Sequence, residues 1–172
     1  EQQLPLMGAR NSGGIFAPTI RYHDGVFYMI TTNVSTGGNF LVHTRDIRGE
    51  WSKPVYINHQ GIDPSLLFDD GKVYFCATQL VDGESSIALY EINPMTGELS
   101  NGPTIISKGI GGKFPEAPHL YRIGEYYYLM LAEGGTEYGH METIFRAKDP
   151  YGPYEGCPHN PILSHKDYQG SP

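Results

Sequence analysis

The chain repeats one pattern three times. Each repeat begins with a short strand that contains a proline, and a tight turn then leads into a second strand rich in apolar and aromatic residues. Pro18, Pro64 and Pro118 mark the equivalent points, which gives a period of about 45 to 55 residues with about four strands per period. This combination is typical of the blades of a β-propeller rather than of a helical solenoid.

The strands expected in each repeat follow from runs of β-forming residues between turn signals. They are 17–22, 26–32, 39–44 and a short strand after 49–54; 63–68, 72–77, 86–92 and a strand after the turn at 93–98; and 117–122, 126–131 and 142–147. We place the blade-like repeats at about 15–60, 61–108 and 112–160, within one partial propeller domain over 1–172. Residues 1–14 are polar and Gly-rich, and residues 11–14 are expected to form a loop that leads into the first strand.

Three repeats are fewer than a closed propeller needs, so we expect further chain to complete the fold. A propeller closes into a ring to bury the faces of its blades, and four blades are the smallest usual number. We therefore expect about three blades of a larger all-β propeller, and we rank a separate three-bladed object lower.

Composition limits the classes of partner. The chain has 22 Gly, 13 Pro and 13 Tyr with 18% charged residues, which favours short strands and tight turns. The net charge is −7 without a basic cluster, so neither a nucleic acid nor an anionic membrane is an expected partner, whereas a neutral sugar is compatible. No apolar run suits a membrane span, and no signal peptide is recognisable. Localisation and oligomeric state stay open.

Cys76 and Cys157 show no metal or redox spacing, so two unpaired thiols are favoured over a disulfide.

Two carboxylates are candidates for acid and base chemistry. Glu116 lies between Pro115 and Pro118, which restrict its backbone, and Asp63 directly precedes Pro64 at nearly the same point of the second repeat. The first strand of each propeller blade lines the central channel, so both side chains should reach one cavity. Such pairing is what glycoside hydrolysis needs. The alternative is structural: Asp before Pro is a common turn starter, and Glu116 can be an ordinary residue at a strand edge.

Four spaced motifs carry a resemblance to a known family. Residues 14–25 (GIFAPTIRYHDG), 61–65 (GIDPS), 114–119 (FPEAPH) and 132–141 (AEGGTEYGHM) resemble glycoside hydrolase family 43 in the same order. The similarity covers nearly the whole chain and is greatest to β-xylosidases and α-L-arabinofuranosidases. It implies the central portion of a five-bladed β-propeller catalytic domain that cleaves β-xylosidic or α-L-arabinofuranosidic bonds of hemicellulose-derived saccharides with inversion.

The resemblance also implies roles for individual residues. Glu116 matches the general acid, and Asp63 matches the carboxylate that tunes the pKa of that acid and orients it. Phe16 stands where the family usually has a tryptophan that lines the sugar pocket, and Ile62 should form a wall of the same subsite. His119 is expected either to support Glu116 at the substrate site or to be a hydrogen-bonded core residue. Thr136 and His140 lie in a Gly-rich loop that can reach the pocket mouth, although turn chemistry explains the glycines equally well.

The chain departs from the family pattern at the general base. That base is an Asp near the start of the first blade, and residues 1–14 contain no Asp. The His and Arg of later blades are also absent, so we expect this portion to be inactive by itself. The expected ligand is a xylo- or arabino-oligosaccharide. The resemblance implies no cofactor within this chain and is compatible with a structural calcium ion in the full domain.

Other readings stay open. A non-catalytic carbohydrate-binding propeller is the main alternative. A propeller of the Trp-Asp repeat kind and a fructan-cleaving propeller are less favoured, because their motifs are missing. The sequence does not separate xylosidase from arabinofuranosidase, or exo from endo action.

Overall fold

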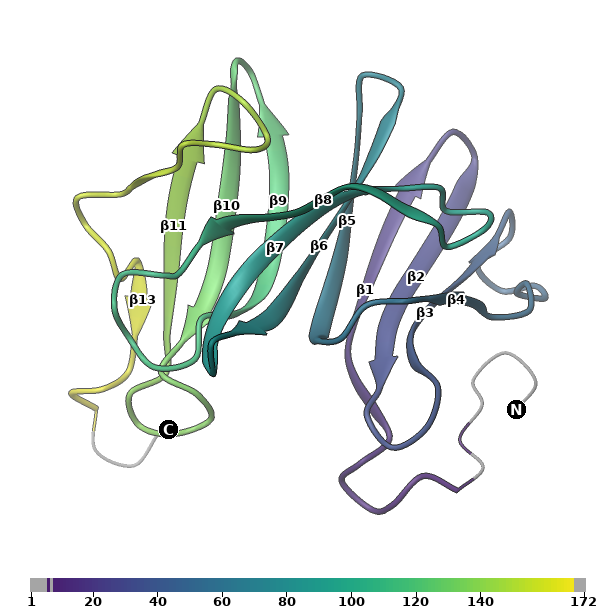
Figure 1. Ribbon diagram of the computed structural model, residues 1–172, viewed down its shortest axis with the longest axis horizontal. Coiled ribbons are helices and arrows are strands. Elements are labelled where there is room, and N and C mark those ends of the chain that lie inside the picture. The colour runs from purple at the N-terminus through teal and green to yellow at the C-terminus, as the bar shows by residue number, and fades with distance from the viewer. Residues whose placement is uncertain (1–5, 7, 169–172) are drawn as a thin grey trace.

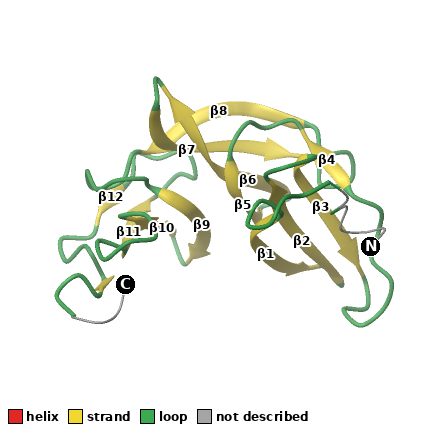
Figure 2. Cartoon of the chain, turned by 90° about the horizontal axis from the view of Figure 1, so that it is seen from below, coloured by secondary structure: helices red, strands yellow, loops and turns green. Residues whose placement is uncertain are grey.

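A computed structural model of the chain describes residue 6 and residues 8–168, so residues 1–5, 7 and 169–172 lie outside the described residues. Within the described part, the strands form three antiparallel sheets that stand side by side in an arc (Figures 1 and 2). No helix in this part is long and apolar enough to cross a bilayer.

Each sheet is a meander in which neighbours in sequence pair with each other. The first contains β1 (Ile15–His23), β2 (Val26–Asn33), β3 (Gly38–Thr44) and β4 (Val55–Ile57). The second contains β5 (Ile62–Asp69), β6 (Lys72–Val81), β7 (Glu84–Ile92) and β8 (Leu99–Ser107). The third contains β9 (Glu116–Ile123), β10 (Tyr126–Glu133), β11 (Met141–Ala147) and β12 (Glu155–Gly156), and β13 (Leu163–Ser164) also pairs with β11. These sheets confirm the predicted all-β architecture.

Tight Asp-Gly turns set the register of the hairpins. Asp24-Gly25 joins β1 to β2, and Asp70-Gly71 joins β5 to β6. All four residues have positive φ, which suits the turns that match the twist of a hairpin. The sequence predicted both turns. It did not single out Asp82-Gly83, which closes the β6–β7 hairpin with the same backbone signs.

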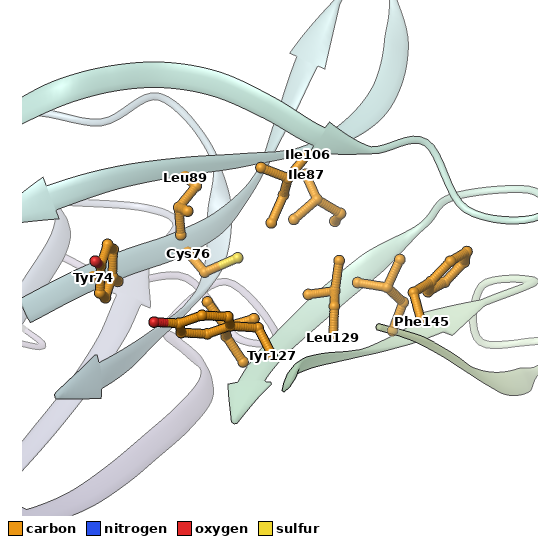
Figure 3. Packing of buried hydrophobic residues seen from close by; sticks show 10 residues of the cluster. Tyr74, Cys76, Ile87, Leu89, Ile106, Tyr127, Leu129 and Phe145 are labelled. Atoms are coloured by element: carbon orange, nitrogen blue, oxygen red, sulfur yellow. The ribbon is translucent and has the colours of Figure 1, made fainter. Parts of the chain in front are cut away.

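The middle sheet is apolar on both faces because its neighbours cover both sides. Alternate residues of β6 point in opposite directions: Phe75 packs toward the first sheet with Ile30 and Leu66, whereas Cys76 packs toward the third sheet with Leu129. Figure 3 shows this second cluster, in which side chains from all the strands from β6 to β11 fill the space between the two sheets. Burial of these side chains fixes the angle at which successive sheets stand.

The same β-bulge occurs at the start of the first strand of every sheet. Two residues, 17–18, 63–64 or 117–118, lie opposite a single residue of the second strand. In each case the first is a non-glycine residue with positive φ, namely 21° at Ala17, 54° at Asp63 and 48° at Ala117, and a proline follows. A bulge redirects the side chains beside it and bends the strand. The sequence repeat therefore corresponds to a repeated backbone feature.

The three bulged strands lie next to one another. β5 contacts both β1 and β9, and Figure 1 shows the purple, teal and green strands in that order. Arg21 of β1 spans the group: its Nε donates to the Leu66 carbonyl at 3.0 Å, and its Nη2 lies 3.0 Å from His119 Nδ1. These contacts hold the first strands of the three adjacent sheets together.

Candidate active site

Glu116 is the first residue of β9 and lies at the wall of a cavity. The cavity has a volume of about 540 Å³, which is within the range of small-molecule sites. It is lined by Gln60, Gly61, Ile62, Thr78, Gln79, Leu80, Ser85, Phe114 and Glu116. Two exposed apolar side chains, Leu80 and Phe114, stand on its rim. Apolar surface beside a carboxyl group disfavours the charged form and raises its pKa, so the group keeps its proton to higher pH.

The pKa of Glu116 is raised above its ordinary value. Burial is the largest cause, the negative charge of Asp63 adds to it, and His140 acts in the opposite direction. The pKa of Asp63 is also raised by burial, and the backbone N–H of Ala117 lowers it again by hydrogen bonding to the carboxylate. In both carboxyl groups burial is the largest cause of the raised pKa, and only Glu116 has the charge of the other acid among its causes.

The hydrogen bond from Ala117 N–H to Asp63 ties the second and third sheets together beside Glu116. Both Asp63 and Ala117 are the first residues of their bulges, and their positive φ values are uncommon for residues with side chains. Such conformations persist only where the surrounding structure fixes them. Here the strand ladders on both sides of each bulge and the link between the bulges provide that restraint.

His119 is fixed by Arg21 and not by Glu116. Because a guanidinium only donates, Nδ1 of His119 accepts from Arg21, and the ring proton of a neutral imidazole is then on Nε2. Burial, followed by the charge of Arg21, lowers the pKa of His119. Arg21 also lies over the ring of Tyr121, 5.3 Å from its centroid. His119 thus forms part of the contact between the innermost strands.

The other residues singled out from the sequence are spread around this site. Ile62 lines the cavity described above. Phe16, at the bulge of β1, and Thr136, in the exposed loop after β10, do not line it, so their substrate contacts stay predictions. His140 of the same loop is held by a contact of 2.7 Å between Nδ1 and the Gly135 carbonyl oxygen.

A second hollow adjoins the first. It has a volume of about 360 Å³ and lies between the β2–β3 loop and residues 59–62. Gln60, Gly61 and Ile62 line both hollows and separate them. Among the residues that the structure describes, no group of three His, Cys, Asp or Glu side chains is placed to hold a metal ion.

Sequence reasoning missed Gln60 and Thr78, and also a group of residues that form one wall of the cavity. Gln79, Leu80 and Ser85 belong to the β6–β7 hairpin, which extends past β5 and forms one wall of the cavity. The long strand runs on either side of Asp82-Gly83 were the available signal, since a hairpin longer than its neighbours must protrude from the sheet.

Comparison with known proteins identifies the family of the chain. The model of the family "Glycosyl hydrolases family 43" matches residues 1–171. A non-reducing end alpha-L-arabinofuranosidase of Bacteroides ovatus is 46% identical over 98% of this chain and 32% of its own length. A beta-xylosidase of Bacillus subtilis is 42% identical over 99% of this chain and 34% of its own length. The chain thus spans about one third of the length of these relatives.

Solved structures give the same result. The Bacteroides ovatus Xyloglucan PUL GH43B structure superposes with a TM-score of 0.89 at 45% identity, over 97% of this chain and 33% of that one. Xylan beta-1,4-xylosidase from Bacillus halodurans superposes with a TM-score of 0.88 at 39% identity, over 97% of this chain and 34% of that one. The three sheets are therefore blades of a five-bladed β-propeller. By sequence and by fold, the chain belongs to glycosyl hydrolase family 43.

Proposed function

We propose that this chain supplies the general acid of an inverting glycoside hydrolase that cleaves β-xylosidic or α-L-arabinofuranosidic bonds of hemicellulose-derived saccharides. The observation that carries the proposal is Glu116 at the wall of a sugar-sized cavity, with a raised pKa and with Asp63 beside it. The names of the Bacteroides ovatus and Bacillus subtilis relatives support the choice of sugars, and they leave the two sugars equally open.

In this mechanism, Glu116 donates its proton to the glycosidic oxygen as the bond breaks. Its raised pKa keeps it protonated at a pH where an exposed Glu is ionised. Inversion also needs a carboxylate about 6.5 to 9.5 Å away that activates water on the opposite face of the sugar. We assign that base to chain outside residues 1–172, so these residues alone are expected to be inactive.

The test is Glu116→Gln in the complete enzyme that contains this chain, assayed on two substrates. Xylobiose or its arabinose counterpart has a poor leaving group and needs protonation, whereas a nitrophenyl glycoside does not. We expect kcat/KM to fall by about 10²- to 10⁴-fold on the first substrate and far less on the second. Glu125→Gln, at the exposed turn on the opposite end of β9 and β10, is the matched control.

Equal losses on both substrates would remove Glu116 from the acid role. Binding of the oligosaccharide by the wild-type complete protein without any hydrolysis would instead favour the non-catalytic sugar-binding propeller.

A further inference from the structure

The segment between β8 and β9, residues 108–115, has no strand of its own and leads directly into Glu116. Its conformation must therefore come from contacts with neighbouring elements. Glu133, the last residue of β10, provides most of them, although its side chain is fully buried at 0% exposure. A carboxyl group so buried must have its oxygens satisfied by donors.

Every hydrogen bond of the Glu133 carboxylate is one in which it accepts. The backbone N–H of Ile110 lies 3.1 Å from Oε1 and 3.2 Å from Oε2, and the N–H of Gly112 lies 3.2 Å from Oε2. The hydroxyl of Thr143, on β11, donates to Oε1 at 2.8 Å. Within the described part of the chain, no Lys, Arg or His forms an ion pair with Glu133. The carboxylate thus binds a loop and not a cation.

Two glycines permit this close approach. A Cβ atom at Gly109, where φ is +72°, would lie 2.5 Å from Oε2 of Glu133, and one at Gly112 would lie 2.9 Å from the same oxygen. Any side chain at either position would collide with the carboxylate. The loop sequence is therefore shaped to Glu133.

Two further hydrogen bonds fix the part of the segment that lies between Gly112 and Glu116. Gly134 N–H, next to Glu133, donates to the Lys113 carbonyl at 2.6 Å, and Ser85 Oγ donates to the Pro115 carbonyl at 2.6 Å. Between these two anchors Phe114 has φ of 51°, an unfavourable value for an aromatic residue. The strained backbone directly before Glu116 is held only because the loop is fixed on both sides.

We infer that Glu133 is a positioning residue for Glu116: it fixes residues 109–113 and thereby sets where the proposed acid meets the glycosidic oxygen. The inference rests on the proposed function of Glu116. A displacement of about 1 Å at a reacting group can lower a rate by about 10²-fold, so a loosened loop should reduce proton transfer without removing the acid itself.

The test is Glu133→Gln in the complete enzyme. Glutamine keeps the shape but offers one acceptor oxygen in place of two and adds an NH₂ that faces the donors Ile110 N–H and Gly112 N–H. We expect kcat on the substrate with a poor leaving group to fall by about 10- to 100-fold, with KM little changed and hydrolysis of the nitrophenyl glycoside nearly unaffected. Glu125→Gln again serves as the matched control.

The double variant Glu133→Gln with Glu116→Gln separates positioning from general support of the fold. If Glu133 acts through Glu116, the double variant is no slower than Glu116→Gln alone, whereas independent effects would multiply. Thr143→Val, which removes a single donor to Glu133 at constant shape, should give a smaller loss with the same dependence on leaving group. If the Glu133→Gln variant does not fold, the Thr143→Val variant still tests the positioning role.

Equal losses on both substrates, or multiplying effects in the double variant, would overturn the positioning role. If Glu116→Gln itself shows no dependence on leaving group, it is the proposed function that fails. If Glu116→Gln shows that dependence while Glu133→Gln and Thr143→Val match the wild type, only this inference is lost.

Discussion

The segment that precedes Asp63 has no room for a side chain at Gly61. A Cβ atom there would lie 2.6 Å from His59 Nε2 and closer still to the carbonyl oxygen of Thr78, while real Cβ contacts essentially never fall under 3.0 Å. Gly61→Ala must therefore displace the start of β5 or the facing part of β6. The backbone oxygen of Thr78 cannot turn aside as a flexible side chain would, because it belongs to a paired strand.

The displacement is resisted from the other side as well. Asn39 Nδ2 donates to the Gly61 carbonyl at 3.0 Å and to the His59 carbonyl at 2.9 Å, so the segment is held between the first and second sheets. Overpacking of this kind costs about 1 to 3 kcal/mol of folding free energy. A shift on the order of 1 Å at Asp63 should also reduce kcat/KM by about 10²-fold.

Thermal unfolding followed by circular dichroism, together with hydrolysis of xylobiose or its arabinose counterpart by the complete enzyme, measures both effects. Gly156→Ala, where the nearest atoms to the new Cβ lie at 3.5 Å, is the matched control and should behave as the wild type. The reasoning fails if Gly61→Ala keeps the melting temperature and the activity of the wild type.

Three further predictions concern charge and packing in the complete protein. Asp63→Asn removes a negative charge that raises the pKa of Glu116, so the basic limb of the pH profile of kcat/KM should move to lower pH; an unmoved limb contradicts the coupling. Because the folded-state pKa of Glu116 is raised, its stabilising contribution is present below about pH 4.3 and is lost as pH rises through the folded-state value. Glu116→Gln should therefore melt above the wild type at pH 7, and the gain should vanish near pH 4; a constant difference would refute this sign. Leu129→Ala, at a fully buried position between the second and third sheets, should lower the unfolding free energy by about 2 to 5 kcal/mol in urea titration, and a loss under 1 kcal/mol would contradict the packing.

The repeat and its turns were readable from the sequence because they depend on local chemistry. Asp-Gly pairs favour positive φ wherever they occur, and the prolines recur at the same point of each first strand. Aligning Pro64 with Pro118 was enough to expect Asp63 and Glu116 in one neighbourhood. The hydrogen bond between Asp63 and Ala117 N–H lies in that neighbourhood.

The backbone at the bulges was not predictable by the same means. Alanine before proline has no preference for positive φ, yet Ala17 and Ala117 both adopt it at the point where the register of the strand pair shifts. The contact of Arg21 with His119 joins residues 98 positions apart, and it exists only once the sheets have packed. Local propensity contains no information of that kind.

The sequence motif around Glu133 was recognised, but the contacts of Glu133 with the segment before Glu116 could not be predicted from it. A Glu at the end of an aromatic strand predicts a solvated charge more often than a buried acceptor. Its partners are mostly backbone N–H groups, which every residue type except proline supplies, so no complementary side chain marked them in the sequence.

The recurrence of one bulge in three sheets has an evolutionary consequence. Ala17, Asp63 and Ala117 occupy equivalent positions at the start of their bulges, yet only Asp63 bears an ionisable group. The fold therefore provides equivalent backbone positions in successive blades. A single codon change at any of these positions would alter the side chain at the start of that blade without changing the fold. Divergence of specificity on such a ring requires no new topology.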